Sequence, residues 1–290
     1  MKTTEVFQVR EPKILKEEIL ILKDKYFHAG NVVIVTVAAS GIGRATAVAM
    51  AVNGVTAVAT DVNEQGGRET VQMARVLGGK AIFVKADLTR DEEIEDLVRQ
   101  ASQLGNIRFL ANIAGMQHID PIENFPMEKC DLMLRIMVRA PFYLSKLCIP
   151  HMKKTEDGVG SIGNMSSVHG HIATRNKPVY NMTKFALRGL TQSIAAEGEG
   201  RIRSFSVSVG FVKTPLTLNQ IPDQAEQRGI PPEEIVRTIM MGRSQVKEMM
   251  TPVEVANLFV AGFSSFLGTY LVGGDLLFDG GITKTYSCGR

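Results

Sequence analysis

The chain has 290 residues, enough for one large α/β domain or two small ones. Its hydrophobic content of 44% and charged content of 22% are typical of a globular protein. A net charge of +3 without a basic stripe argues against a nucleic-acid surface, and no apolar run is long enough to span a bilayer. The three cysteines lack metal-type spacing and no cleavable-signal pattern is found, so we expect a reduced, cytoplasmic protein without a metal site.

Residues 1–29 are expected to form a helical extension outside the core. Their apolar residues recur at helical spacing with Lys and Glu between them, at Leu15, Ile19, Leu22 and Tyr26. This pattern predicts an amphipathic helix that packs on its own domain or on a partner subunit. Residues 30–290 contain no repeat and no low-complexity linker, which favours a single domain there.

Strands and helices alternate through most of the remaining chain. Runs rich in β-branched and apolar residues predict strands at about 32–35, 55–60, 81–85, 108–113, 161–165 and 203–209. Helices are predicted between them, including a long one at about 127–152 that Pro141 and Pro150 should bend or stop. This alternation indicates an α/β fold, a doubly wound parallel sheet with right-handed crossovers. Residues 215–250 interrupt the rhythm and are either a lid over a site or a plain helical insertion.

The first strand runs into a glycine turn, Ser40-Gly41-Ile42-Gly43, and then into a helix. Such a turn presents backbone N–H groups and a helix dipole to a pyrophosphate. Asp61 ends the second strand, where a carboxylate can accept hydrogen bonds from ribose hydroxyls and repel a 2′-phosphate, which favours NAD over NADP. The alternative for Asp61 is a turn or helix-cap residue. Asp87-Leu88 could hold the adenine, and Asn112-Ile113-Ala114-Gly115 would lie beside the ribose.

Tyr180 and Lys184 stand four residues apart, which places them on one face of a helix, and Ser167 precedes them. A lysine ammonium beside a phenol favours the phenolate, so the tyrosine could serve as a general base or acid. Ser167 could donate a hydrogen bond to a reacting oxygen. The alternative is a surface helix with a solvated lysine. The combination predicts hydride transfer between a nicotinamide cofactor and a small hydroxy or keto compound.

Several motifs together resemble the short-chain dehydrogenase/reductase family, over about residues 31–283. They are Thr36 to Gly43, Asn112 to Gly115, Ser167, Tyr180-xxx-Lys184 and Asp279-Gly280-Gly281. The resemblance implies a Rossmann-type sheet of seven strands, a homotetramer, and a cofactor lying across the carboxyl ends of the strands. It also implies that Lys184 binds the nicotinamide ribose and that further cofactor contacts come from Thr36, Ala114, Val212 and Thr214.

Shorter stretches resemble bacterial D-3-hydroxybutyrate dehydrogenases, at residues 115–118, 167–170, 176–180 and 219–221. This resemblance implies that the substrate is contacted by Gln117, His169, Lys177 and Gln220, besides Ser167 and Tyr180. A carboxylate taken from water needs charge-assisted donors, which these side chains could supply. Each of the four could instead be an ordinary loop or surface residue. The prediction is a 3-hydroxy acid substrate, with a larger hydroxyacyl or cyclic alcohol as the alternative.

Three positions depart from the family pattern. Val37 replaces the first turn glycine, and a β-branched side chain would crowd the turn, severely so at positive φ. Met137 replaces an asparagine that supports a proton-relay water near the catalytic lysine, and a thioether cannot replace its hydrogen bonds. Val209 replaces a proline beside the nicotinamide. Val37 and Met137 leave a second alternative, a catalytically impaired dinucleotide-binding scaffold or sensor.

Overall fold

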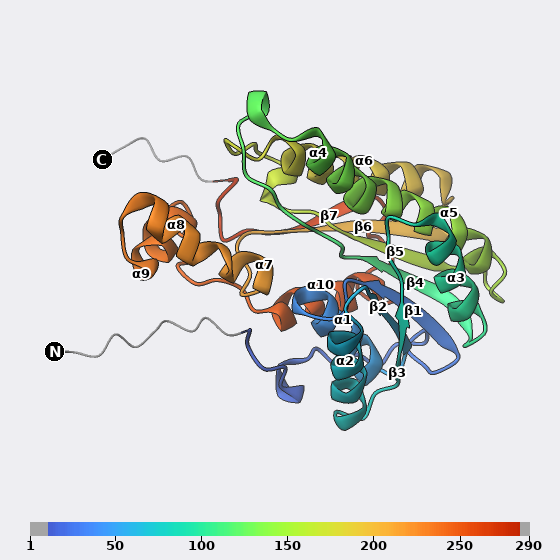
Figure 1. The fold of residues 1–290 in the computed structure, drawn as a ribbon. Helices are drawn as coiled ribbons and strands as arrows, with labels where there is room; N and C mark the ends of the chain where they lie inside the picture. Colours follow the sequence, from blue (N-terminus) through green and yellow to red (C-terminus); the bar gives the residue numbers. More distant parts are fainter. Residues whose placement is uncertain (1–10, 285–290) are drawn as a thin grey trace.

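The computed structural model describes residues 11–284, which are built around one seven-stranded sheet (Figure 1). Its order is β3-β2-β1-β4-β5-β6-β7, and all neighbouring strands are parallel. The strands are β1 Asn31–Thr36, β2 Thr56–Asp61, β3 Ala81–Lys85, β4 Asn106–Asn112, β5 Gly160–Met165, β6 Ile202–Val209 and β7 Gly274–Phe278. The predicted doubly wound parallel sheet is confirmed.

The first strand, β1, lies in the middle of the sheet. The next two strands, β2 and β3, are added on one side of it, and β4 to β7 are added on the other. All six residues of β1 are buried, because helices cover both faces of the sheet. Val33 and Val35 pack into one apolar core, whereas Val32 and Ile34 pack into the other. The strand order reverses between β1 and β4, and this is where open α/β sheets form a ligand crevice.

The helices form one layer on each side of the sheet (Figure 1). One layer comprises α1 Gly41–Val52, α2 Glu64–Val76 and α10 Pro252–Phe263. The other comprises α3 Asp91–Ser102, α4 Met127–Leu134, α5 Ala140–Lys153 and α6 Pro178–Glu197. Among residues 11–284, no helix is both long and apolar enough to cross a bilayer.

The long helix predicted at 127–152 is interrupted, although not by a proline. A π-helical turn, Arg135–Arg139, joins α4 to α5, and the helix continues past Pro141 and Pro150. A π-turn adds one residue to the helical repeat and often marks a functional site. Met137 lies in this turn and is completely buried.

The amphipathic helix predicted near the N-terminus is not formed. Within residues 11–29 only Lys16–Glu18 makes a short 3₁₀ turn. Side chains of the domain satisfy part of the remaining backbone, as where Leu22 N–H donates to Asn53 Oδ1 at 2.9 Å. The segment therefore packs on its own domain without helical hydrogen bonds. The rest of the predicted extension, residues 1–10, lies outside the described part of the chain.

Short helices follow β6 and lie beyond the carboxyl end of that strand (Figure 1). They are α7 Pro215–Leu218, α8 Gln220–Arg228, α9 Pro232–Glu234 and the π-helical turn Ile235–Met240. They pack around a separate apolar cluster that includes Leu218, Ile221, Ile235, Met240, Met241 and Met249. These methionines form the core of the segment and are not available to line an apolar substrate pocket.

Candidate active site

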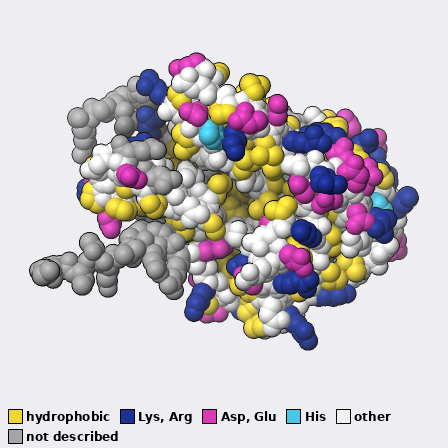
Figure 2. All heavy atoms as spheres, viewed as in Figure 1, with side chains coloured by type: hydrophobic (Ala, Val, Ile, Leu, Met, Phe, Trp, Pro, Cys, Tyr) yellow, Lys and Arg dark blue, Asp and Glu magenta, His cyan; other side chains and the backbone are white. Residues whose placement is uncertain are grey.

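A cavity of about 140 Å³ lies at the carboxyl ends of β1, β5 and β6, between the glycine turn, the start of α6 and α7. It brings together predicted residues from distant parts of the chain, namely Ser40, Gly41, Ile42, Gly43, Gly115, Ser167, Tyr180, Lys184, Val212 and Thr214. The space-filling view shows the described surface of the molecule from the same side as the ribbon (Figure 2). Ligand pockets are typically about 300 Å³ or larger, so this cavity could hold only part of a dinucleotide.

The glycine turn is strained at the position where the sequence departs from the family. Val37 has φ 52°, in the left-handed region that β-branched residues avoid. A Cβ on Gly43 would lie 2.1 Å from Val37 O, so only glycine fits there. The predicted crowding is therefore present. The turn nevertheless keeps the close backbone approach that a pyrophosphate requires, with α1 starting at Gly41.

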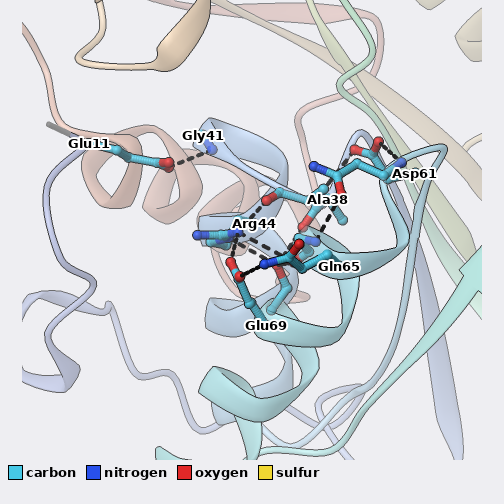
Figure 3. A network of polar contacts seen from close by, with 11 residues as sticks. Glu11, Ala38, Gly41, Arg44, Asp61, Gln65 and Glu69 are labelled. Carbon is cyan, nitrogen blue, oxygen red and sulfur yellow. Dashed lines mark hydrogen bonds and ion pairs between the residues drawn. The ribbon is translucent and has the colours of Figure 1, made fainter.

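Asp61 lies at the end of β2, beside this turn. Its Oδ2 accepts from Ala39 N at 3.1 Å and its Oδ1 from Asn63 N at 2.9 Å (Figure 3). Both hydrogen bonds hold the carboxylate in place while leaving it partly exposed. The carboxylate and the turn fit an adenosine ribose and a pyrophosphate, respectively.

The other cofactor residues predicted near β1 and β4 support the crevice without lining the cavity. Thr36 Oγ1 accepts from Ile113 N at 2.8 Å and from Ala114 N at 3.1 Å, and so ties the end of β1 to the loop after β4. Asn112 Nδ2 donates to Asn164 Oδ1 at 2.9 Å, and its own Oδ1 is buried without a partner.

Asp87 and Leu88 lie after β3, farther along the same edge of the sheet. Asp87 Oδ1 accepts from Thr89 N at 2.8 Å, which makes it a turn-capping residue, and Leu88 is buried in an apolar core. Neither side chain lines the cavity.

The three candidate catalytic residues meet at the floor of the cavity. Ser167 follows β5, while Tyr180 and Lys184 lie in the first two turns of α6. The Lys184 ammonium lies 5.3 Å from the centroid of the Tyr180 ring and donates to Met165 O at 2.8 Å. The Ser167 hydroxyl is a hydrogen-bond partner of Tyr180, and this bond acts against the rise in pKa that burial causes.

Burial, however, shifts both pKa values in the direction that disfavours the charged form of each side chain. It raises the pKa of Tyr180 to about 12, in spite of Ser167, and lowers the pKa of Lys184 to about 8. The expectation that Lys184 lowers the tyrosine pKa is therefore wrong for the protein alone. Desolvation of the phenol outweighs its hydrogen bond with Ser167, and the Lys184 ammonium donates to a backbone carbonyl.

Two buried nitrogens near these residues have no partner among the described atoms, His169 Nε2 and Gln117 Nε2. His169 Nδ1 lies 3.1 Å from Ser167 Oγ, and its ring meets the Tyr180 ring edge-on at 5.3 Å. Burial and the positive charges of Lys177 and Lys184 lower the pKa of His169 to about 4. His169 is therefore neutral at pH 7, and burial also lowers the pKa of Lys177.

Gln220 does not join this group. Its amide Nε2 donates to Leu216 O, one turn earlier in its own segment. A side-chain hydrogen bond to the preceding helical turn cannot be predicted from a sequence motif. The sequence reasoning also missed Met165, whose carbonyl holds Lys184, and Leu216 and Thr217, which line the cavity. Their positions within three residues of Ser167 and Thr214 were the available signal.

Met137 occupies the place predicted from the family pattern. It is fully buried, and its sulfur accepts from Met116 N at 3.4 Å. A Cβ on Gly115 would lie 3.9 Å from Lys184 Nζ and 4.0 Å from Met137 Sδ, so the thioether and the ammonium approach the same spot.

The chain is similar in sequence and in fold to known proteins. The family model for short chain dehydrogenases matches residues 31–225. D-beta-hydroxybutyrate dehydrogenase of Rhizobium meliloti is 33% identical over 86% of this chain and 97% of that protein, and the Cupriavidus necator enzyme is 32% identical over 80% and 90%. A Beutenbergia cavernae structure described as an NAD(P) dependent gluconate 5-dehydrogenase, with bound NADP at low occupancy, is 27% identical with a TM-score of 0.79 and covers 90% of this chain and 100% of its own. The chain belongs to the short-chain dehydrogenase/reductase family, oxidoreductases that act on CH–OH groups.

Proposed function

We propose that this protein is an NAD-dependent dehydrogenase that interconverts D-3-hydroxybutyrate, or a close 3-hydroxy acid, and the corresponding 3-keto acid. The observation that carries the proposal is the pair of unpartnered buried nitrogens, His169 Nε2 and Gln117 Nε2. Buried polar nitrogens are normally satisfied, so these two indicate polar atoms on a ligand; Gln117 Nε2 donates, and His169 Nε2 donates when Nδ1 accepts from Ser167. A carboxylate supplies acceptors for both.

Lys177 would provide the matching positive charge. It lies close enough to His169 to lower the pKa of the imidazole. The loop that carries Gln117 is joined to the loop that carries Lys177, because Asp120 N donates to Asn176 O at 2.9 Å. The loops that carry Gln117 and Lys177 are therefore held together beside the start of α6, which supports a shared role for these side chains.

The reaction would use the side chains in named roles. The Tyr180 oxygen takes the hydroxyl proton as the carbinol carbon gives up its hydride, and Ser167 holds the reacting oxygen. When bound, the nicotinamide accepts that hydride, and its positive charge beside the phenol favours the phenolate that burial alone disfavours. Lys184 would hold the nicotinamide ribose, and Val212 and Thr214 the carboxamide and phosphate side. Because the base must be deprotonated, oxidation should accelerate as the pH rises.

NAD is proposed over NADP on the strength of Asp61. Its carboxylate is fixed by two backbone N–H groups beside the glycine turn and forms no ion pair among the described residues. A ribose hydroxyl could donate to it, whereas a 2′-phosphate would be repelled. The expected homotetramer and cytoplasmic location stay predictions.

Lys177→Ala tests the carboxylate argument, with Arg175→Ala as the matched control. Both remove a cation from the same loop, but Arg175 is exposed. The loss of Lys177 should raise KM for D-3-hydroxybutyrate at least about tenfold, as expected for a lost charge-assisted hydrogen bond, and Arg175→Ala should not. A neutral ester of the same acid should be affected little by either change. Unchanged kinetics in Lys177→Ala, or a preference for longer or cyclic alcohols, would overturn the substrate assignment.

The second candidate function is a dinucleotide-binding protein with little turnover. It is favoured by Val37 at φ 52° and by the Met137 thioether beside the lysine. Calorimetric titration with NADH, followed by an assay for NADH production, separates the two. Binding without turnover on any hydroxy acid would favour the sensor or scaffold.

A further inference from the structure

A carboxylate from outside the residues that the family model matches reaches the glycine turn. Glu11 Oε1 accepts a hydrogen bond from Gly41 N at 2.5 Å (Figure 3). Gly41 is the first residue of α1, where the unpaired N–H groups and the helix dipole attract anions. A Cβ on Gly41 would lie 3.3 Å from Thr214, so this N–H stands between the turn and the base of α7. The Glu11 carboxylate thus takes up a donor of the expected pyrophosphate site.

The segment that carries Glu11, which we call the N-terminal arm (residues 11–24), is fixed at its far end. Asn257 of α10 accepts from Leu20 N and donates to Glu18 O, each at 2.8 Å. The arm is also bonded to Asn53, which ends α1, so it spans that helix from its last residue to its first. Twelve helical residues measure about 18 Å, and nine extended residues reach about 30 Å. Tethering at this distance keeps Glu11 at a high local concentration beside the turn.

No cation pairs directly with Glu11 in the described part of the chain. Arg44 is the nearest, but its guanidinium donates to Ala39 O and Gly66 O and pairs with Glu69 (Figure 3). Burial raises the pKa of Glu11, against the pull of the Gly41 N–H and of Arg44. The hydrogen bond to Gly41 is therefore the main contact that holds this carboxylate, and a phosphate oxygen could replace it.

We propose that Glu11 is a residue of the dinucleotide site that opposes cofactor binding, because its carboxylate and a cofactor phosphate compete for the Gly41 N–H. This inference rests on the proposed dinucleotide-binding function. Two anions cannot share this donor without repulsion, so the arm must withdraw when the cofactor enters. The arm would thereby set the cofactor concentration at which the enzyme becomes loaded.

The test measures NADH affinity of the full chain by the change in NADH fluorescence, without substrate. Glu11→Gln removes the charge and Glu11→Ala removes the contact, whereas Glu17→Gln makes the same charge change in the arm away from the turn. The dissociation constant should fall about three- to tenfold in Glu11→Gln, at least as much in Glu11→Ala, and remain unchanged in Glu17→Gln. The gain in NADH affinity should shrink as the salt concentration rises from about 0.05 to about 0.5 M, since salt screens the repulsion between the Glu11 carboxylate and the cofactor phosphate.

The outcomes separate this inference from the proposed function. If the wild-type protein and all three variants bind NADH with the same affinity, Glu11 does not compete and only this inference fails. Weaker NADH binding in Glu11→Gln would show that the carboxylate supports cofactor binding, and this result would also overturn the inference. If neither the wild-type protein nor Glu11→Ala binds NADH at millimolar concentration, the proposed function fails as well.

Discussion

Replacing Val37 by glycine should relieve the strain in the cofactor turn. Val37 has φ 52°, which costs an L-residue roughly 1–2 kcal/mol that glycine does not incur. Against this, the loss of a half-buried isopropyl group costs about 1 kcal/mol and the greater freedom of glycine in the unfolded chain about 0.5–1 kcal/mol. The terms nearly cancel, so we expect Val37→Gly to change the free energy of unfolding by less than about 1 kcal/mol.

Val159→Gly is the matched control for this prediction. Val159 is also a half-buried valine packed against a core cluster, but it is not at positive φ. Without strain relief, its replacement should cost about 2 kcal/mol, which for a protein of this size lowers Tm by roughly 4–8 °C.

Urea unfolding and thermal scans of both variants measure the difference directly. NADH binding should also tighten in Val37→Gly, because a glycine lets the turn adopt the geometry of the family. If Val37→Gly loses as much stability as Val159→Gly, the turn is not strained and the reasoning is refuted.

Three further predictions concern the site. Because burial holds the pKa of His169 at about 4, below its ordinary 6.5, the native state should lose stability as the pH falls from 6.5 towards 4, by up to ~3 kcal/mol. In urea unfolding, the free energy of unfolding of His169→Gln should fall less between pH 7.5 and 4.5 than that of the wild-type protein. An equal fall would assign the effect to other groups. Asp61→Ala should raise the ratio of kcat/KM with NADP to that with NAD at least about tenfold, since the repulsion of a 2′-phosphate disappears; an unchanged ratio would rule Asp61 out as the discriminating residue. Met137→Asn should raise kcat while lowering Tm, because it restores a polar relay and buries an amide in an apolar cluster. A lower Tm without faster turnover would show that the relay does not limit the rate.

The sheet and the catalytic trio could be predicted from the sequence because their signals are local. The β-branched run of β1, the glycine turn and the Tyr180–Lys184 spacing each reflect a backbone geometry that few other residues permit. The arm could not be predicted this way, since apolar residues at helical spacing also suit an extended segment bonded to Asn53 and Asn257. The pKa values of Tyr180 and Lys184 depend on desolvation by the whole fold, so the sequence pair alone indicated the wrong direction.

The helices after β6 have a core of their own, and this determines how the crevice can open. Their buried side chains pack mainly on one another, whereas α1 and α10 pack on the sheet. The two ends of this segment are joined by a backbone bridge between Val212 and Met250, and Gln245 N also donates to Gly280 O at 2.8 Å, after β7. An outward rotation of these helices about the bridge would expose little apolar surface, either on the helices or on the sheet domain. Admission of a bulky dinucleotide should therefore require a hinge at this bridge and release of the hydrogen bonds to Gly280, while the helices after β6 keep their own core.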